Sequence, residues 1–280
     1  MFDKIANGWE LAKASGRVLR LDKELLVFPF LSGIACLLVL GSFGLPLFLS
    51  GAVTIDRHAD QVTQNPLAYV LLFAFYFCNY FVIVFFNSAL IACAIIRFNG
   101  GEPSLGDGLQ AASARLPQIL GWSLVSATVG FLLKMVESRS EKVGAFVADL
   151  LGLAWSIVTF FVIPVIVVEK VGPIDAIRRS GSILRRTWGE AFVGNQGIGL
   201  FVFLFALVSC LPALLGYLSH VPALMIAGGA ITAVALIIVA AISAALHSIL
   251  LAAIYVFAAD GRVPDAFDRS TLQAAFTPRR

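Results

Sequence analysis

The sequence predicts an all-α polytopic membrane protein with six transmembrane helices in three tandem repeats, each a cytoplasmic amphipathic helix followed by a transmembrane hairpin. Three observations support this fold class. The chain has six long apolar stretches, its basic residues gather in alternate gaps between them, and a Gly-Pro-Asp pattern recurs after every second stretch. With 59% apolar and 13% charged residues, it departs from soluble proteins, which average about 45–50% and 25%.

Each apolar stretch suits a membrane crossing, for which about 20 apolar residues suffice. The stretches run at 25–49, 66–96, 117–133, 144–168, 191–217 and 222–259. The second would reach roughly 46 Å as a helix, more than a hydrocarbon core of roughly 30 Å, so we expect it to tilt or protrude. The last is longer still, and we expect a break near Gly228-Gly229 or a short outer helix before the span. The first stretch is too long for a signal-peptide core and predicts an uncleaved span.

Prolines lie within or near the ends of four stretches, at Pro29, Pro46, Pro164 and Pro212. Proline cannot donate the hydrogen bond of a helix interior, so each position marks either a kink or a span end. The sequence leaves both alternatives open.

The basic residues predict the orientation. Five lie before residue 25, two between 97 and 116, five between 169 and 190, and four after 261, whereas only four of the 20 lie in the other gaps. By the positive-inside rule, both termini are cytoplasmic, and we expect the chain in a bacterial inner membrane. A net charge of +3 gathered at membrane edges is explained by topology and anionic headgroups, so no nucleic-acid partner is expected.

An internal repeat organises the chain as a single membrane domain, 1–280. The run 87–93 at the end of the second stretch aligns with 247–253 at the end of the sixth. Each even-numbered stretch is followed by a similar junction, in which glycine is expected to end one helix and proline with an early Asp to begin the next: Gly101-Glu102-Pro103 with Asp107, Gly172-Pro173-Ile174-Asp175, and Gly261-Arg262-Val263-Pro264-Asp265. The predicted repeat units are about 1–100, 101–171 and 172–261, followed by a cytoplasmic tail at 262–280.

The segments that open the repeats are amphipathic and cationic. Ser15-Gly16-Arg17-Val18-Leu19-Arg20 is similar to Ser180-Gly181-Ser182-Ile183-Leu184-Arg185. Apolar residues recur at spacings of three and four, and basic residues take the opposite face. Such helices lie in the headgroup plane, so three or four cytoplasmic surface helices are expected to contact anionic lipid headgroups. The predicted contacts are Lys13, Arg17, Arg20, Arg178, Arg179, Arg185 and Arg186.

Six spans, the cytoplasmic junctions and the run 169–176 resemble a group of uncharacterised bacterial six-helix membrane proteins of unknown function. The opening 2–9 with Asp22-Lys23-Glu24-Leu25 resembles one family of that group. It is also similar to the membrane domain attached to some bacterial glycerophosphoryl diester phosphodiesterases. The motifs mark fold rather than chemistry, and because no catalytic domain is present in this sequence, the resemblance does not imply that activity.

Polar side chains at bilayer depth are the candidate site residues. Asn87 with Ser88 and His247 with Ser248 occupy equivalent repeat positions about ten to thirteen residues before the inner surface, which predicts a place near the bilayer midplane. They either line a polar path for a solute or make hydrogen bonds between helices, which average about 0.6 kcal/mol in membrane bundles.

No catalytic, cofactor-binding or metal-ligating residues are predicted. The chain has no HExxH or GxSxG motif and no phosphate loop. Its four cysteines all lie inside predicted spans and are far apart in sequence, with no CxxC pair. We therefore expect a non-enzymatic protein, a lipid-associated scaffold or a partner of a membrane complex, with self-association also open. The alternative is a transporter or channel for a small or amphipathic solute along the repeat axis.

Overall fold

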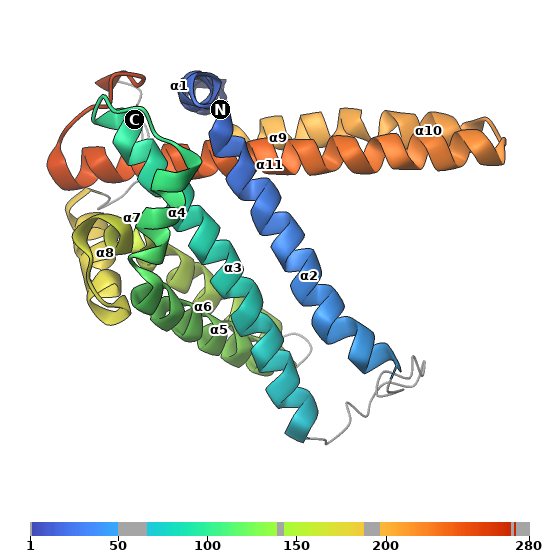
Figure 1. Ribbon diagram of the computed structural model, residues 1–280, viewed down its shortest axis with the longest axis horizontal. Helices are drawn as coiled ribbons and strands as arrows, with labels where there is room; N and C mark the ends of the chain where they lie inside the picture. The colour runs from blue at the N-terminus through green and yellow to red at the C-terminus, as the bar shows by residue number, and fades with distance from the viewer. Residues whose placement is uncertain (1, 50–65, 139–142, 188–196, 270–271, 273–280) are drawn as a thin grey trace. The chain divides into compact units, whose positions relative to one another are not determined.

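The computed structural model describes residues 2–49, 66–138, 143–187, 197–269 and 272. Within these residues every regular element is helical, which confirms the all-α prediction (Figure 1). Five helical segments are long and apolar enough to cross a membrane: Lys23–Leu45, Val70–Phe98, Leu116–Val136, Phe146–Glu169 and Pro222–Asp260. The fifth predicted stretch contributes a shorter apolar segment, Val202–Leu218, and its first residues, 191–196, lie outside the described part.

The helices fall on the predicted apolar stretches and amphipathic segments. Those of the apolar stretches are α2 (Val27–Leu49), α3 (Pro66–Phe98), α5 (Leu116–Ser138), α6 (Val143–Val158), α7 (Val162–Glu169), α9 (Gly197–Ser209), α10 (Leu211–Leu218) and α11 (Pro222–Asp260). Those of the amphipathic segments are α1 (Phe2–Leu21), α4 (Leu105–Ser113) and α8 (Pro173–Thr187). A short 3-10 helix, η1 (Lys23–Leu26), joins α1 to α2.

Two of the four prolines accompany helix interruptions. The fourth stretch is divided into α6 and α7 just before Pro164, and the fifth into α9 and α10 at Cys210, just before Pro212. Neither proline can donate to the carbonyl four residues earlier, so the regular ladder stops there. In contrast, α2 runs through both Pro29 and Pro46.

The expected break in the last stretch is wrong. Residues Pro222–Asp260 form one continuous helix of 39 residues, roughly 58 Å long at helical rise. Gly228 serves packing instead, because a Cβ there would meet the carbonyl oxygen of Pro212, whereas a Cβ at Gly229 would meet nothing within 4 Å. The helix changes character along its length, because its first two thirds are largely exposed and residues 248–256 are buried without interruption.

The described chain divides into two compact units. The first comprises Met1–Pro29, Cys93–Asp107 and Ile183–Arg280. Within it, α9 and α10 run antiparallel to α11, and α1, seen end-on in Figure 1, crosses both α9 and α11. Two close approaches fix the register of this hairpin, since Gly216 lies beside Leu224 and Gly228 beside Pro212. The N–H of Ala213 also donates to the Thr232 hydroxyl at 3.1 Å.

The second unit comprises Phe30–Ala92 and Gly108–Ser182. Its α5 and α6 pack side by side, with the rings of Trp122 and Trp155 stacked at 5.8 Å. An edge-to-face contact between Phe73 and Phe131 joins α3 to α5. Gly130 of α5 lies against the Tyr80 hydroxyl of α3, and its lack of a side chain lets these two helices approach.

The junctions differ from expectation in which residue ends the helix. Gly100 rather than Gly101 takes a positive φ of 81°, and Lys170 rather than Gly172 takes a φ of 61°. At the third junction Gly261 does so as expected, with its N–H bonded to the Phe257 carbonyl at 3.0 Å. After it, residues 262–268 are not helical, so no helix begins at Pro264, whereas Arg269 and Leu272 are helical.

Candidate functional site

One face of α1 is packed against the hairpin, and the neighbouring face is cationic. The packed face recurs at spacings of three and four, as expected for a helix lying on a surface. It comprises Leu11, Ala14, Ser15, Val18 and Leu19, all buried. Helical spacing predicts an apolar stripe of Ile5, Trp9, Ala12, Gly16 and Leu19. Among its described side chains only Leu19 is buried, while Trp9, Ala12 and Gly16 lie beside the cations.

The unpacked part of that stripe forms the wall of a groove of about 590 Å³, which we call the α1 groove. Its lining is Trp9, Ala12, Lys13, Gly16, Arg17 and Arg20 from α1, Val202 and Phe205 from α9, and Val239, Ile242, Ser243 and Leu246 from α11. The floor is therefore apolar, and all charge comes from α1. A Cβ added at Gly16 would meet nothing within 4 Å, so the groove is open at that point.

The three cations of the α1 groove lie on one helix face, because they are spaced by four and three residues. Lys13 Nζ lies 2.9 Å from the Glu10 carboxylate and 5.4 Å from the centre of the Trp9 ring. Arg17 donates to the carbonyl oxygen of Ala266 at 2.7 Å, which uses one of the five N–H donors of its guanidinium. Arg20 is exposed. No Asp or Glu is among the residues that line the groove.

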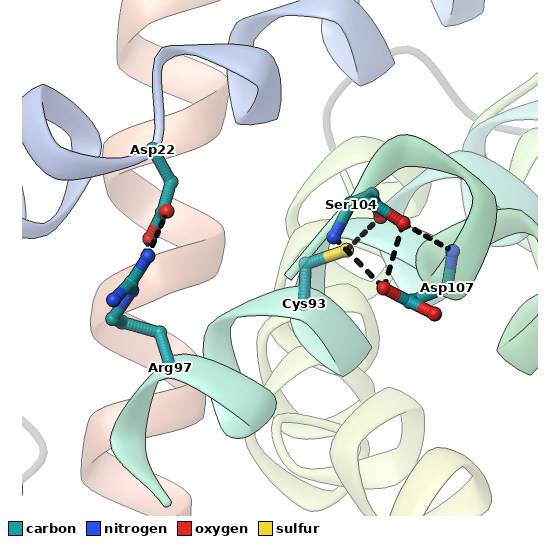
Figure 2. A network of polar contacts seen from close by, with 5 residues as sticks. All are labelled: Asp22, Cys93, Arg97, Ser104 and Asp107. Atoms are coloured by element: carbon teal, nitrogen blue, oxygen red, sulfur yellow. Dashed lines mark hydrogen bonds and ion pairs between the residues drawn. The ribbon is translucent and has the colours of Figure 1, made fainter. Parts of the chain in front are cut away.

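The end of α1 is fixed by an ion pair. Figure 2 shows the guanidinium of Arg97, at the end of α3, facing the carboxylate of Asp22. Arg97 Nε donates to Asp22 Oδ2 at 2.6 Å, and its Nη2 pairs with Oδ1, so the contact is bidentate. The side chains are 24% and 7% exposed, so this pair is largely removed from solvent. A bidentate pair of this geometry fixes direction as well as distance.

The start of α4 is capped by its own side chains (Figure 2). Ser104 donates to Asp107 Oδ2 from its hydroxyl at 2.6 Å and from its N–H at 2.9 Å, while the Asp107 N–H donates back to the Ser104 hydroxyl at 3.2 Å. This is a reciprocal capping arrangement. The hydroxyl and the N–H of Ser104 lower the pKa of the Asp107 carboxyl. The Cys93 thiol reaches the Ser104 carbonyl at 3.5 Å and ties the cap to α3.

The predicted lipid contacts of α8 are placed differently from those of α1. Arg178 lies 3.4 Å from the Asp175 carboxylate, and Arg179 Nε donates to both oxygens of Glu169, at 2.8 and 3.1 Å. Arg185 is exposed, and the side chain of Arg186 lies outside the described residues. The structure thus brings Lys13, Arg17 and Arg20 together at one groove, where Lys13 also pairs with Glu10 of its own helix. In α8, Arg178 pairs with Asp175 and Arg179 with Glu169 of α7.

A serine of α8 meets the interruption between α6 and α7. The hydroxyl of Ser180, fully buried, accepts a hydrogen bond from the N–H of Phe161 at 3.1 Å. Phe161 directly precedes α7, where N–H groups have no partner inside the helix. Ser180 therefore stabilises a break that proline creates.

The predicted intramembrane polar residues do not share one unit. Asn87 and Ser88 belong to the second unit, where Ser88 is fully buried, and its hydroxyl has no hydrogen-bond partner within the described residues. His247 and Ser248 belong to the first, where Ser248 is buried and His247 is exposed. The place predicted for Asn87 and His247 near the bilayer midplane stays a prediction.

The described residues hold no group of three His, Cys, Asp or Glu that could bind a metal ion. Sequence reasoning missed four arrangements: the Asp22–Arg97 pair, the Ser104–Asp107 cap, the Ser180–Phe161 bond and the apolar floor of the α1 groove. A signal existed for the cap, since Ser-x-x-Asp before a helix is a capping pattern. For the other three, the partners are too far apart in sequence to be paired from spacing.

The described residues are helical and include five helices long and apolar enough to span a membrane, which indicates a membrane-embedded protein. A model described as Family of unknown function (DUF6159) matches residues 66–265, so the chain belongs to that family. No curated protein matches it. The expected membership of an uncharacterised family is confirmed, while the similarity to the membrane domain of phosphodiesterases stays a prediction. The match includes α9 and α11 but begins after α1.

Proposed function

We propose that this protein is a non-enzymatic, lipid-associated scaffold of a bacterial inner membrane, with six spans in three repeats and both termini in the cytoplasm. The observation that carries the proposal is the placement of α1. Its buried face lies on the apolar helices α9 and α11, and its cations lie on the adjacent face. An amphipathic helix arranged in this way is suited to the boundary between headgroups and acyl chains.

Burial supports the proposed repeat. Residues 88–94 at the end of α3 and residues 248–256 at the end of α11 are buried without a break, and they overlap the runs 87–93 and 247–253 that align in sequence. The fifth predicted span is supported by length, because Gly197–Leu218 covers roughly 33 Å at helical rise, about the thickness of a hydrocarbon core. The interruption at Cys210 divides that length without shortening it.

Topology is tested by reporter enzymes. Fusions after Gln61 and Ser219 are expected to be active as exported reporters and fusions after Ser180 as cytoplasmic ones, because the basic gaps stay inside. The reverse pattern would overturn the proposal.

The scaffold role is tested separately, by purification from native membranes and mass spectrometry of what remains bound. Anionic lipids and stoichiometric partner subunits are expected. A protein that leaves the membrane alone and without lipid would contradict the role.

A solute path is the second candidate, and the interruptions between α6 and α7 and between α9 and α10 favour it. Broken membrane helices expose backbone groups at which transporters bind their substrates. Flux of a small solute into liposomes that is lost in both Asn87→Ala and His247→Ala would support transport over the scaffold role.

A further inference from the structure

We propose that the α1 groove binds one anionic membrane lipid, with an acyl chain on the apolar floor and the phosphate of its headgroup held by Lys13, Arg17 and Arg20. This inference rests on the proposed membrane location and names the ligand of that surface. The volume of the α1 groove, about 590 Å³, lies within the range of roughly 300–1,000 Å³ that is typical of small-molecule sites.

The lining has an apolar part and a cationic part, which match the acyl chain and the anionic headgroup of a lipid. Val202, Phe205, Val239, Ile242 and Leu246 supply an apolar floor, and the charged lining residues are all basic. An occupant must therefore carry a long apolar part joined directly to a negative group. Around a membrane hairpin, anionic lipids are the ligands of that chemistry.

The position of the groove along the hairpin agrees with this occupant. Val202 lies in the second turn of α9, and it lines the groove together with Leu246 of α11. The cations thus lie near the N-terminal end of α9. This is the end that the basic gap at 169–190 predicts to be cytoplasmic and next to the headgroups. A chain entering from the cationic rim would run along the floor in the direction of the bilayer centre.

The cations retain capacity for a phosphate. Arg17 uses one of five donors on Ala266, and a guanidinium can bind phosphate through two parallel N–H groups. Lys13 is held by Glu10 and Trp9 at the rim, where its ammonium serves as a point charge. Near a membrane surface each basic residue strengthens the binding of anionic lipid roughly fivefold.

Gly16 allows the groove to be filled without disturbing the fold, since a Cβ there meets nothing. The test reconstitutes the full chain into nanodiscs with equal amounts of phosphatidylglycerol and phosphatidylcholine and measures the lipid retained after extraction by native mass spectrometry. The unaltered chain is expected to retain phosphatidylglycerol in preference to phosphatidylcholine. Gly16→Leu and, from the opposite wall, Ser243→Leu are expected to lose it.

Gly181→Leu is the matched control, because Gly181 is the equivalent glycine of α8 and is equally open. It is expected to retain the lipid. Arg20→Gln is expected to lower the preference for phosphatidylglycerol roughly fivefold without changing retention of phosphatidylcholine. Elution as a single monodisperse species establishes that each variant is folded.

Equal retention of the two lipids by the unaltered chain would overturn the inference, as would unchanged retention in both Gly16→Leu and Ser243→Leu. Occupation by an amphipathic peptide or by a second copy of the chain, seen as added mass that Gly16→Leu removes, would also overturn it. These failures differ from failure of the proposed function. A reversed pattern of reporters would remove the membrane topology itself, whereas loss of lipid selectivity with correct topology removes only this site.

Discussion

The amphipathic helices α1 and α8 carry the same short pattern, a serine and a glycine followed by apolar and basic residues. Both serines are fully buried. In α8, Ser180 accepts a hydrogen bond from Phe161 at the break between α6 and α7. In α1, the hydroxyl of Ser15 has no partner within the described residues.

The basic residues of the two helices also differ in their hydrogen-bond partners. In α8, Arg179 is held by both oxygens of Glu169, a residue of α7. In α1, Arg17 and Arg20 lie over helices that offer no carboxylate to the groove. The same pattern therefore forms an ion pair with the neighbouring helix in α8, whereas in α1 it forms a cationic rim above the apolar side chains of α9 and α11. The function of such a helix is decided by what lies beneath it.

The largest expected difference concerns the ion pairs at the two helices. Asp22→Ala leaves Arg97 without its bidentate partner in a largely buried site, so we expect a loss of about 3 kcal/mol in the free energy of unfolding. Glu169→Ala removes a pair whose side chains are 26% and 38% exposed, where solvent screens the charge, and should cost about 1 kcal/mol or less. Unfolding of the purified protein in mixed micelles measures both. Equal losses would contradict the distinction.

A second comparison tests the hairpin on which α1 lies. Gly228→Ala places a Cβ against the Pro212 carbonyl, where backbone must move, so a loss of about 1–3 kcal/mol is expected. Gly229→Ala is the matched control: its Cβ meets nothing, and alanine in a helix interior is expected to gain about 0.5–1 kcal/mol. If both variants gained stability, the close approach of α10 to α11 would be wrong. The same unfolding assay applies.

The third comparison uses the two serines directly. Ser180→Ala removes the hydrogen bond to the Phe161 N–H, and about 1 kcal/mol of stability should be lost. Ser15→Ala removes a buried hydroxyl without a described partner, so stability should stay unchanged or rise slightly. Hydrogen exchange at the first amides of α7 should accelerate in Ser180→Ala alone. Acceleration in both variants would show that the helices are not used differently.

Much of the fold was predictable because its signals are local. The long apolar stretches predict most of the helices, and the amphipathic spacing of residues predicts α1, α4 and α8 at their observed places. The predictions were wrong at glycines, because a glycine in a sequence can either end a helix or allow two helices to pack closely. Gly228 was expected to break α11, but the partner that makes it a packing residue, Pro212, lies in another helix. Lys170 ends α7 with a positive φ although Gly172 is two residues away, and propensity alone favours glycine.

The candidate site was predictable only in part. The face of α1 that carries Lys13, Arg17 and Arg20 follows from helical periodicity, so a cationic surface was expected. The apolar floor was not, because Val202 and Leu246 are brought to α1 by the register of a hairpin far away in sequence. Asp22 gave no sign of its partner, since Arg97 is 75 residues away.

The smallest expected effect is pH-dependent and compares the starts of α4 and α8. Hydrogen bonds from Ser104 lower the pKa of Asp107 in the folded protein, so this carboxylate stabilises the fold above its unfolded pKa. That contribution is lost as pH falls through the lowered folded value. We therefore expect the first amides of α4 to exchange faster, relative to a pH-matched reference peptide, in acid. Asp107→Asn should remove this pH dependence.

Asp175→Asn is the control for that experiment. Asp175 also lies in the first turn of its helix, but its carboxylate faces Arg178 at 3.4 Å with both side chains exposed, and no side-chain cap involving it is present in the described part of α8. Its replacement should leave exchange at α4 unchanged. If Asp107→Asn kept the acid-induced acceleration, the carboxylate would not be its cause. The cap of α4 would then depend on the hydrogen bond from the Asp107 N–H to the Ser104 hydroxyl. Ser104→Ala, which removes that hydroxyl, would test this.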